Sequence, residues 1–221
     1  TGAGDFSSGV ANLTTLGMVY TGNANSGTFT ASSASGGYSG TSGSVTVSGG
    51  TATRLVITGS GSQAAGASQN LTITAVDGSG NTDTTYTGSN PKSLTFSGAG
   101  SSTNPVTAPT VEDSSGNVIA FGSTTGIKFT SGVATVSNGR NGVMRLYKAE
   151  SATISATDGS ISSSGSDRLT VTVSAASMNK FALSLASPQT NGVAFTGTNT
   201  LTAQDPYGNA VSFNASANNV T

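Results

Sequence analysis

Cysteine, histidine and tryptophan are all absent from the 221 residues of this sequence, and charged residues make up only 8% of it. Without cysteine the chain has no disulfide framework. Without histidine or cysteine it lacks the commonest catalytic bases, nucleophiles and transition-metal ligands. The net charge of −1 provides no basic surface for nucleic acid or an anionic membrane, and no apolar run approaches the roughly 20 residues that cross a bilayer. We therefore expect no enzymatic activity, no nucleic-acid partner and no membrane insertion.

The remaining residues offer little other catalytic chemistry. Glu112 and Asp113 are adjacent, so on a strand their carboxylates point to opposite faces. None of the many serines sits in a Gly-x-Ser-x-Gly turn between a strand and a helix. The abundance of Ser, Thr and Asn, together with 31 Gly, is instead typical of a secreted or surface-exposed β protein. We expect an extracellular or cell-surface location.

Short alternating runs within Gly142–Val173 indicate β-strands. Residues 169–173 alternate Leu, Val and Val with threonine, which is the period-two pattern of a strand with one buried face. Residues 152–157 show the same alternation, and the β-prone run 143–148 precedes them. We expect three adjacent antiparallel strands that share one apolar face and form half of a sandwich.

The chain repeats itself at an interval of about 125 residues. Segments near the N-terminus match segments of the middle, and segments of the middle match the C-terminal part. The matched pairs are Phe6–Ala11 with Phe129–Ala134, Phe29–Ala31 with Ile154–Ala156, Val45–Val47 with Val171–Val173, Arg54–Leu55 with Lys180–Phe181, and Thr72–Ala75 with Thr200–Ala203. We predict one complete repeat at 52–175, flanked by the C-terminal half of a repeat at 1–51 and the N-terminal half of another at 176–221.

The complete repeat contains about seven to nine candidate strands separated by turn signals, with no helical periodicity, which predicts an all-β chain of tandem immunoglobulin-like sandwiches. The Gly/Ser/Pro-rich stretch Gly98–Asp113 is predicted to be a loop insertion. The candidate strands are Gly9–Leu13, Leu16–Tyr20, Gly27–Ser32 and Ser44–Ser48 in the first segment, and Arg54–Thr58, Asn70–Val76, Ser93–Ser97, Val118–Phe121, Ile127–Phe129, Val133–Ser137, Val143–Lys148, Ala152–Thr157 and Arg168–Val173 in the second.

These segments carry a resemblance to a known family. The succession RLVITG, NLTITAVDGSGN, SGVATV, GVMRLYKAE, ATISATDG and LTVTV between residues 54 and 173 resembles bacterial immunoglobulin-like repeats of the invasin, intimin and filamin-like kinds. The resemblance implies tandem β-sandwiches in very large surface or adhesive proteins. It implies a fold and a location rather than a ligand, because such domains are scaffolds for many functions.

Asp77, Asn81 and Asp83 are the candidate metal ligands. They offer two carboxylates and an amide oxygen within seven residues, and calcium takes 6–8 oxygen ligands. The alternative is a turn in which Asp77 accepts backbone amides and a Gly-Asn pair takes positive φ angles. The matching segment Asp205–Asn209 favours the turn, because Val211 stands there in place of Asp83. Apart from calcium, no cofactor is predicted.

Three functions are compatible with these features. The first is a structural module of an extracellular filament, stalk or adhesin, assembled head-to-tail from copies of itself or adjacent repeats. The second is an accessory module of a secreted protein that binds carbohydrate or a host protein, for example through Gly98–Pro109; an accessory domain of a secreted enzyme is a third. Tyrosines near strand ends belong to such a binding surface or cap the core with their hydroxyl groups satisfied. They are Tyr20, Tyr38, Tyr86 and Tyr207.

The two predicted half repeats bear on assembly. Neither residues 1–51 nor residues 176–221 can close a core alone, so each is expected to expose an apolar face and unpaired strand edges. We expect the C-terminal half of one unit and the N-terminal half of the next to complete one sandwich. The next unit is either a continuation of the same polypeptide or a second subunit that exchanges strands, and repeated head-to-tail contacts of this kind generate a filament.

Overall fold

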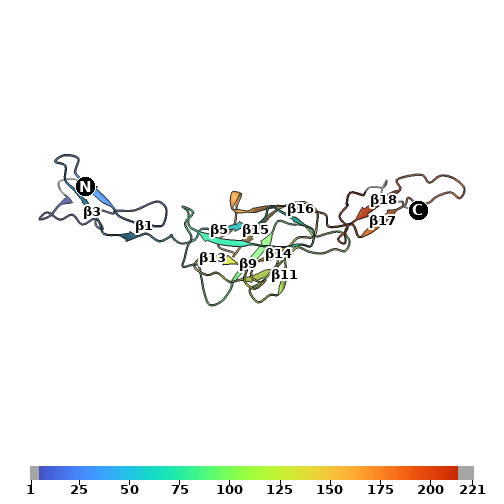
Figure 1. Cartoon of the computed structure of the whole chain (residues 1–221), viewed down its shortest axis with the longest axis horizontal. Helices are drawn as coiled ribbons and strands as arrows, with labels where there is room; N and C mark the ends of the chain where they lie inside the picture. The colour runs from blue at the N-terminus through green and yellow to red at the C-terminus, as the bar shows by residue number, and fades with distance from the viewer. Residues whose placement is uncertain (1–4, 214–221) are drawn as a thin grey trace.

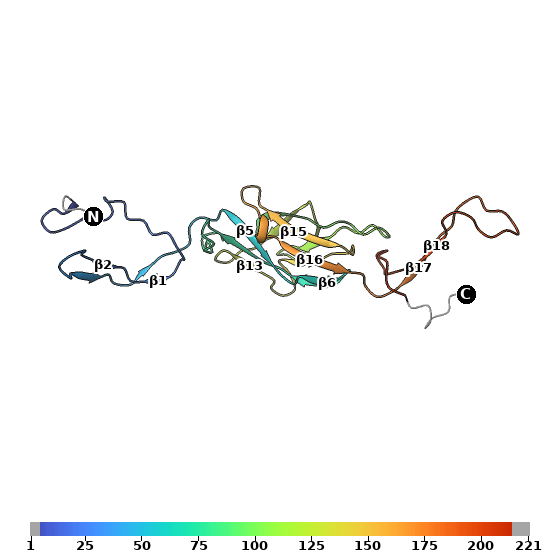
Figure 2. The same cartoon turned by 90° about the horizontal axis from the view of Figure 1, so that it is seen from above.

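The computed structural model describes residues 5–213. The molecule is elongated, with a broad central part and one narrow segment projecting from each end (Figures 1 and 2). Residues 5–213 are essentially all β, and their helical content is limited to short 3-10 turns such as Gly165–Asp167. Within the same range no helix is long and apolar enough to cross a membrane. The all-β class predicted from the alternating runs is therefore confirmed.

Residues 54–174 form what we call the central segment, and the residues before and after it are the terminal segments. Three sheets in the central segment enclose one core. Their strand orders are β12-β9-β15-β16-β6, β13-β8-β5 and β11-β10-β14-β7. Neighbouring strands are antiparallel except for β6 and β16, which are parallel. The strands are β5 (Arg54–Thr58), β6 (Ser62–Ala64), β7 (Ser68–Asn70), β8 (Thr72–Val76), β9 (Lys92–Ser97), β10 (Thr110–Glu112), β11 (Val118–Ala120), β12 (Thr124–Ile127), β13 (Val133–Thr135), β14 (Val143–Arg145), β15 (Ser151–Thr157) and β16 (Leu169–Ser174).

The core of the central segment follows from alternation along these strands. On β5, Leu55 and Ile57 are buried while Val56 between them is only partly buried. Each fully buried side chain of this size contributes about 1.5–3 kcal/mol to folding, and all three sheets supply such residues. The largest of them are Leu55, Leu71, Ile73, Leu94, Phe96, Ile127, Phe129, Met144, Leu146 and Ile154.

The strand order corrects one prediction for the central segment. The sequence predicts that residues 143–148 lie beside 152–157, but β14 belongs to another sheet, where it pairs with β10 and β7. The chain passes from one sheet to the other between β14 and β15. Only β15 and β16 are adjacent as predicted. Alternation identifies a strand and its buried face, but it contains no information about which strand lies beside it.

Other strands were missed or have different limits. The central segment has twelve strands rather than seven to nine, because β6, β7 and β10 were not predicted. β6 and β7 are polar triplets at sheet edges, Ser-Gln-Ala and Ser-Gln-Asn, where little apolar surface is buried. β10 lies inside the stretch Gly98–Asp113 that was predicted to be a loop, and β12 begins at Thr124 rather than Ile127.

The terminal segments form only small ladders. The predicted strands Gly9–Leu13 and Leu16–Tyr20 are wrong, because Val10 makes only an isolated bridge with Ser7 and the chain turns immediately afterwards. A strand needs a neighbour for its backbone groups, and within residues 5–213 none lies beside these two runs. The ladders that do form are β1 (Ser26–Gly27) with β4 (Val45–Thr46), β2 (Thr30–Ser32) with β3 (Ser39–Thr41), and β17 (Lys180–Ser184) with β18 (Thr200–Gln204).

The apolar side chains of the terminal segments are largely open to solvent. Among residues 5–213, every exposed large hydrophobic side chain except Val106 and Val118 lies in 6–45 or in 178–201. Within residues 5–213 no layer of strands covers these side chains, in contrast to the core of the central segment.

We expect the central segment to fold on its own. A polypeptide of residues 52–175 keeps every pairing among β5 to β16 and every buried residue of the core cluster, and loses only the partly buried Ala176 and Tyr207 that pack against it. It should give a β-type far-ultraviolet circular dichroism spectrum, a cooperative thermal transition and a monomeric elution volume. The spectrum of a disordered chain would show that one of the two boundaries removes residues that the core needs.

Candidate functional site

Two loops of the same sequence pattern, Asp-x-x-Gly-Asn, follow equivalent strands. Asp77–Asn81 follows β8, and Asp205–Asn209 follows β18. In each, one carboxylate oxygen of the aspartate accepts the backbone amides two and four residues later, at 2.9 and 2.9 Å in the first loop and 2.8 and 2.9 Å in the second. Gly80 and Gly208 have φ angles of +89° and +85°, a conformation that favours glycine. This geometry is the turn that was weighed against calcium binding, except that only the glycine of each Gly-Asn pair takes a positive φ angle; Asn81 and Asn209 do not.

The second carboxylate oxygen of each aspartate reaches the chain that connects two segments. Asp77 Oδ2 accepts the amide of Gly50 at 2.9 Å, and Asp205 Oδ2 accepts the amide of Ala176 at 2.9 Å. Gly50 leads from the N-terminal segment into β5, and Ala176 leads from β16 towards β17. We call these two places the first and second junctions.

The asparagine at the end of each loop bridges to the segment that precedes the junction. The Asn81 side chain accepts the amide of Ala24 at 2.8 Å and donates to the carbonyl of Gly22 at 3.1 Å. The Asn209 side chain makes the same pair of bonds with Ala149 at 2.8 Å and Tyr147 at 2.8 Å. One side-chain amide thus binds one donor and one acceptor of a neighbouring backbone.

The contacted backbones occupy matching positions in the predicted repeat. Gly22 and Ala24 precede Phe29 by the same intervals as Tyr147 and Ala149 precede Ile154, the residue that matches Phe29. In both cases the contacted loop leads directly into the next strand, β1 or β15. The two junctions are therefore made by the same hydrogen bonds between equivalent residues.

Hydrogen bonding keeps both aspartates ionised. The amide of Gly50, followed by the backbone and side-chain groups of Asn81, lowers the pKa of Asp77 to about 2. Burial opposes ionisation of Asp205, but the side chain of Asn209 and the amide of Ala176 hold its pKa below the usual range. At neutral pH both junctions consequently contain charge-assisted hydrogen bonds, which are stronger than bonds between neutral groups.

A third loop has the same pattern, but its asparagine side chain does not bridge to another segment. In Asp113–Asn117 the carboxylate accepts the amides of Ser115 and Asn117 at 2.8 and 2.8 Å, and the Asn117 side chain donates to Asp113 at 2.9 Å. Among the described residues the Asn117 side chain binds nothing outside its own loop. Residues 113–117 carry the pattern Asp-Ser-Ser-Gly-Asn in the sequence, a signal for this turn that considering Glu112 and Asp113 as an acid pair does not use.

The acid pair Glu112 and Asp113 has structural contacts. Glu112, at the end of β10, forms an ion pair with Arg145 on the neighbouring β14, with 2.6 Å between Oε1 and Nη1. Asp113 is occupied by its own turn, as described above. The two carboxylates therefore do not act on a common centre.

The stretch Gly98–Pro109 reaches the second junction. The Nζ of Lys180, at the start of β17, donates to the carbonyl of Asn104 at 2.7 Å, and the amide of Asn104 donates to the carbonyl of Tyr207 at 3.2 Å. The Tyr207 ring in turn packs against Tyr147, with 5.0 Å between ring centroids. The residues around Asn104, expected as a candidate ligand-binding loop, are thus partly occupied by the C-terminal segment.

Of the three candidate calcium ligands, the structure brings two together. The Nδ2 of Asn81 donates to Asp77 at 3.1 Å, whereas Asp83 accepts the amide of Ala52 at 2.8 Å and the hydroxyl of Thr85 at 2.6 Å. The Thr85 hydroxyl is the main cause of the lowered pKa of Asp83. No group of three or more Asp, Glu, His or Cys side chains in residues 5–213 is arranged to hold a metal ion. Calcium at this loop stays a prediction from the sequence.

The four tyrosines of the proposed binding surface differ in their surroundings. Tyr86 is half-buried against Phe129, and its hydroxyl donates to Asp158 at 2.5 Å; burial and then this bond raise its pKa. Tyr207 is likewise partly buried against the core. These two cap the core, whereas Tyr38 is largely exposed. Tyr20 packs on Phe29 in the N-terminal segment.

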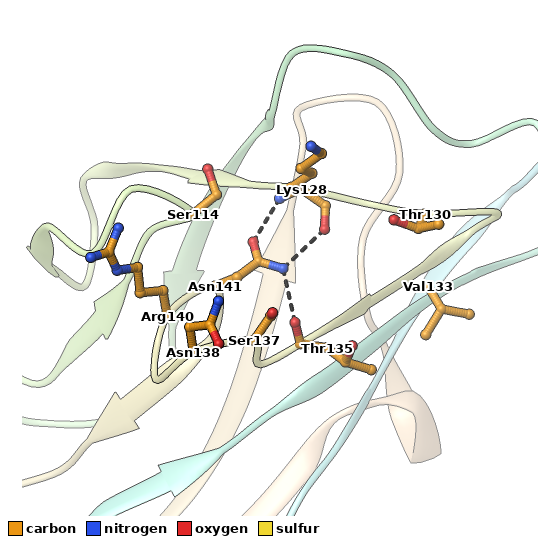
Figure 3. A pocket seen from close by; sticks show the side chains of 9 residues that line it. All are labelled: Ser114, Lys128, Thr130, Val133, Thr135, Ser137, Asn138, Arg140 and Asn141. Carbon is orange, nitrogen blue, oxygen red and sulfur yellow. Dashed lines mark hydrogen bonds between the residues drawn. The ribbon is translucent and has the colours of Figure 1, made fainter.

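A polar pocket of about 610 Å³ lies beside β13 (Figure 3). Asn141 closes one wall, because its side chain binds the amide and carbonyl of Lys128 at 2.7 and 3.0 Å and the carbonyl of Thr135 at 3.0 Å. The charged ends of Lys128 and Arg140 point in different directions, so they do not converge on one anion (Figure 3). The pocket lining is Ser114, Lys128, Thr130, Val133, Thr135, Ser137, Asn138, Arg140 and Asn141.

No protein-family model and no curated protein matches the chain. The two junctions and the pocket are therefore the features of the structure that bear on function. The resemblance to bacterial immunoglobulin-like repeats stays a prediction from the sequence.

Calcium should not change the thermal stability. Backbone and side-chain donors already fill the oxygens of Asp77 and Asp83 that a cation would need, so binding would have to break these bonds. We expect the same melting midpoint with millimolar calcium and with chelator, measured by differential scanning calorimetry. A midpoint that rises with calcium and falls again in chelator would contradict this expectation.

The first junction should weaken only in strong acid. Because the pKa of Asp77 is lowered in the folded state, its contribution is present above the ordinary pKa near 3.8 and is lost as the pH falls towards about 2. In a nuclear magnetic resonance titration the amide of Gly50 should shift with a midpoint near 2. Asp77→Asn should abolish this titration. A midpoint near 4 would show that the Gly50 bond is not formed in solution.

Proposed function

We propose that this chain is a structural module of an extracellular filament, stalk or adhesin, in which immunoglobulin-like sandwiches follow one another head-to-tail. The proposal depends on one observation: the two junctions are formed by the same set of hydrogen bonds. Each joins an aspartate to the connecting chain and an asparagine to the preceding loop, with the same donors and acceptors. A protein that uses one junction twice in succession is suited to building a regular array.

The junction bonds would also fix the orientation of each domain relative to the next one in such an array. A connection made by one flexible linker would let neighbouring domains rotate freely. Here the linker is bound at Gly50 or Ala176, and the preceding loop is bound at a second place by Asn81 or Asn209. Two points of attachment restrict rotation about the linker. The elongated shape in Figures 1 and 2 agrees with a stalk function.

The immunoglobulin-like assignment is part of the proposal. It is supported by facing sheets of mainly antiparallel strands, by the shared core of the central segment, and by the sequence resemblance described above. The extracellular location is supported by the low charge and the abundance of Ser, Thr, Gly and Asn. The scarcity of catalytic side chains supports a structural function rather than an enzymatic one.

A second candidate is an accessory module that binds carbohydrate or a host protein. The pocket in Figure 3 favours it, because hydroxyl and amide groups of Thr130, Ser137 and Asn138 line a depression large enough for a small ligand. However, its charged groups diverge, and no aromatic ring is among its lining residues, which sugar stacking would use. We therefore place the structural function first.

Substitution of the junction asparagines tests the proposed function. Because the chain has no cysteine, spin labels can be attached at introduced cysteines, Thr28→Cys and Ser160→Cys across the first junction, and Ser160→Cys and Ser184→Cys across the second. We expect Asn81→Ala to broaden the first distance distribution and Asn209→Ala to broaden the second in double electron–electron resonance.

Asn117→Ala is the matched control, since Asn117 occupies the same position in its loop but its side chain, within the described part of the chain, bonds only to Asp113 of that loop. It should leave both distributions as narrow as in the parent chain. Distributions that are already broad in the parent, or unchanged in both junction variants, would refute a stiff, regularly joined module.

A further inference from the structure

We propose that the pocket beside β13 binds an acidic polysaccharide, in which carboxylates on neighbouring sugar units pair with Lys128 and Arg140. This inference goes beyond the structural function and does not depend on it, because the pocket lining shares no residue with either junction. It assigns a ligand to a module whose junctions have only a structural role.

Lys128 and Arg140 differ from the other basic side chains of the protein. The chain has eight Lys and Arg residues, all within residues 5–213. Among the described residues, the charged ends of Lys128 and Arg140 have no hydrogen-bond or ion-pair partner. Each of the others places its charged end against a carboxylate, a backbone carbonyl or an aromatic ring. These are Arg54, Lys92, Arg145, Lys148, Arg168 and Lys180. The two basic groups without a partner therefore line the same pocket.

No acidic side chain lines this pocket. The acid nearest to it in the sequence, Asp113, has both carboxylate oxygens bonded within its own turn, to Ser115 and Asn117. The lining thus carries two positive charges and no negative charge, in a chain whose net charge is −1. A concave surface lined by charge of one sign concentrates ligands of the opposite charge.

The remaining lining groups suit a ligand that is rich in hydroxyl groups. Among the described residues, the side chains of Thr130, Ser137 and Asn138 have no hydrogen-bond partner, so they can donate to and accept from a ligand. Nucleic acid suits the site less well than a polysaccharide. The lining holds no aromatic ring on which a base could stack, and the chain offers no further basic surface to follow a phosphate backbone.

The direction of the charged groups selects the class of sugar. Neutral sugars are commonly held by stacking on aromatic rings, which this lining lacks. The charged ends of Lys128 and Arg140 point away from each other (Figure 3), so a single carboxylate does not reach both. Successive acidic sugars of a polysaccharide carry separate carboxylates. One can pair with the lysine and the next with the arginine, whose planar group binds a carboxylate through two parallel bonds.

The third Asp-x-x-Gly-Asn loop supports Arg140. The Arg140 side chain passes over Gly116, where a Cβ atom would lie 3.0 Å from Nε and 3.1 Å from Cδ. The carbonyl of Asp113 accepts the amide of Asn141 at 2.9 Å, which fixes the backbone beside Arg140. The loop also contributes Ser114 to the lining. The loop whose asparagine makes no junction thus helps to form the pocket.

Nuclear magnetic resonance titration of the isotopically labelled 221-residue chain tests the proposal. The probes are a tetramer of galacturonate, a tetramer of sialic acid and, as the neutral control, maltotetraose. The acidic tetramers should shift the backbone amides of Lys128, Asn138 and Arg140, whereas maltotetraose should leave them unchanged. Added salt should weaken the binding, because it screens charges that are exposed to solvent.

Two variants remove one charge each and keep most of the side chain. Lys128→Gln and Arg140→Gln should each weaken binding about two- to fivefold, the effect of one exposed ion pair, and the double variant should bind more weakly than either. Arg168→Gln is the matched control, since Arg168 is exposed but lies outside the pocket lining. It should bind like the parent chain.

Four results would overturn the proposal. They are the absence of shifts with both acidic tetramers at millimolar concentration, equal binding of maltotetraose, parent-like affinity in the double variant, and tighter binding of a single-stranded DNA tetramer than of either acidic sugar. The last result would assign the pocket to nucleic acid instead. The spin-label distances across the junctions are measured without any ligand, so failure of this inference leaves the proposed function intact.

Discussion

Each junction between neighbouring segments depends on one aspartate carboxylate, which accepts hydrogen bonds both from its own turn and from the linker. In the first junction loop, the carboxylate of Asp77 accepts four hydrogen bonds, three from its own loop and one from Gly50. The loop bonds hold the side chain rigid, so the fourth bond to the linker involves little further loss of side-chain freedom. Its ionised state, favoured by a pKa of about 2, strengthens all four bonds. Without the turn, the same carboxylate would be a mobile surface group of little structural value.

Burial of apolar area is concentrated in the central segment and is small in the two terminal segments. In the central segment, facing sheets exclude water from residues such as Ile154 and Phe96, which are fully buried. Within residues 5–213 the terminal segments form only two- and three-residue ladders and the hairpin of β17 and β18, and a hairpin without a covering layer buries little. A similar residue pattern therefore gives a core in one context and an exposed face in another. The local register, such as Leu183 opposite Leu201, is formed in both contexts.

Much of the fold could be predicted from the sequence because the alternation of Thr with Val, Ile or Ala is strong. It located β5, β8, β15 and β16 to within about two residues, together with their buried faces. It missed β6 and β7, whose role is to pair at sheet edges rather than to bury side chains, and it placed β14 beside β15 because nearness along the chain is not nearness in a sheet. For the junction, the sequence predicted the Asp77 turn. It could not identify the backbone that Asn81 binds, since Gly22 and Ala24 are recognised through main-chain groups that every residue has.

Recognition through the main chain has a consequence for how such modules vary. The second junction uses Tyr147 where the first uses Gly22, and Ala176 where the first uses Gly50, yet every hydrogen bond is kept. Side chains at the contacted positions can therefore change without loss of the contact, whereas the Asp, Gly and Asn of the loop cannot, because they supply the acceptor, the positive φ angle and the two-way amide. The loop Asp113–Asn117 shows the limit of the pattern: it forms the same turn, but within residues 5–213 its Asn117 side chain bonds only within the loop. The pattern makes a rigid binding loop, and a junction results only where a neighbouring backbone lies within its reach.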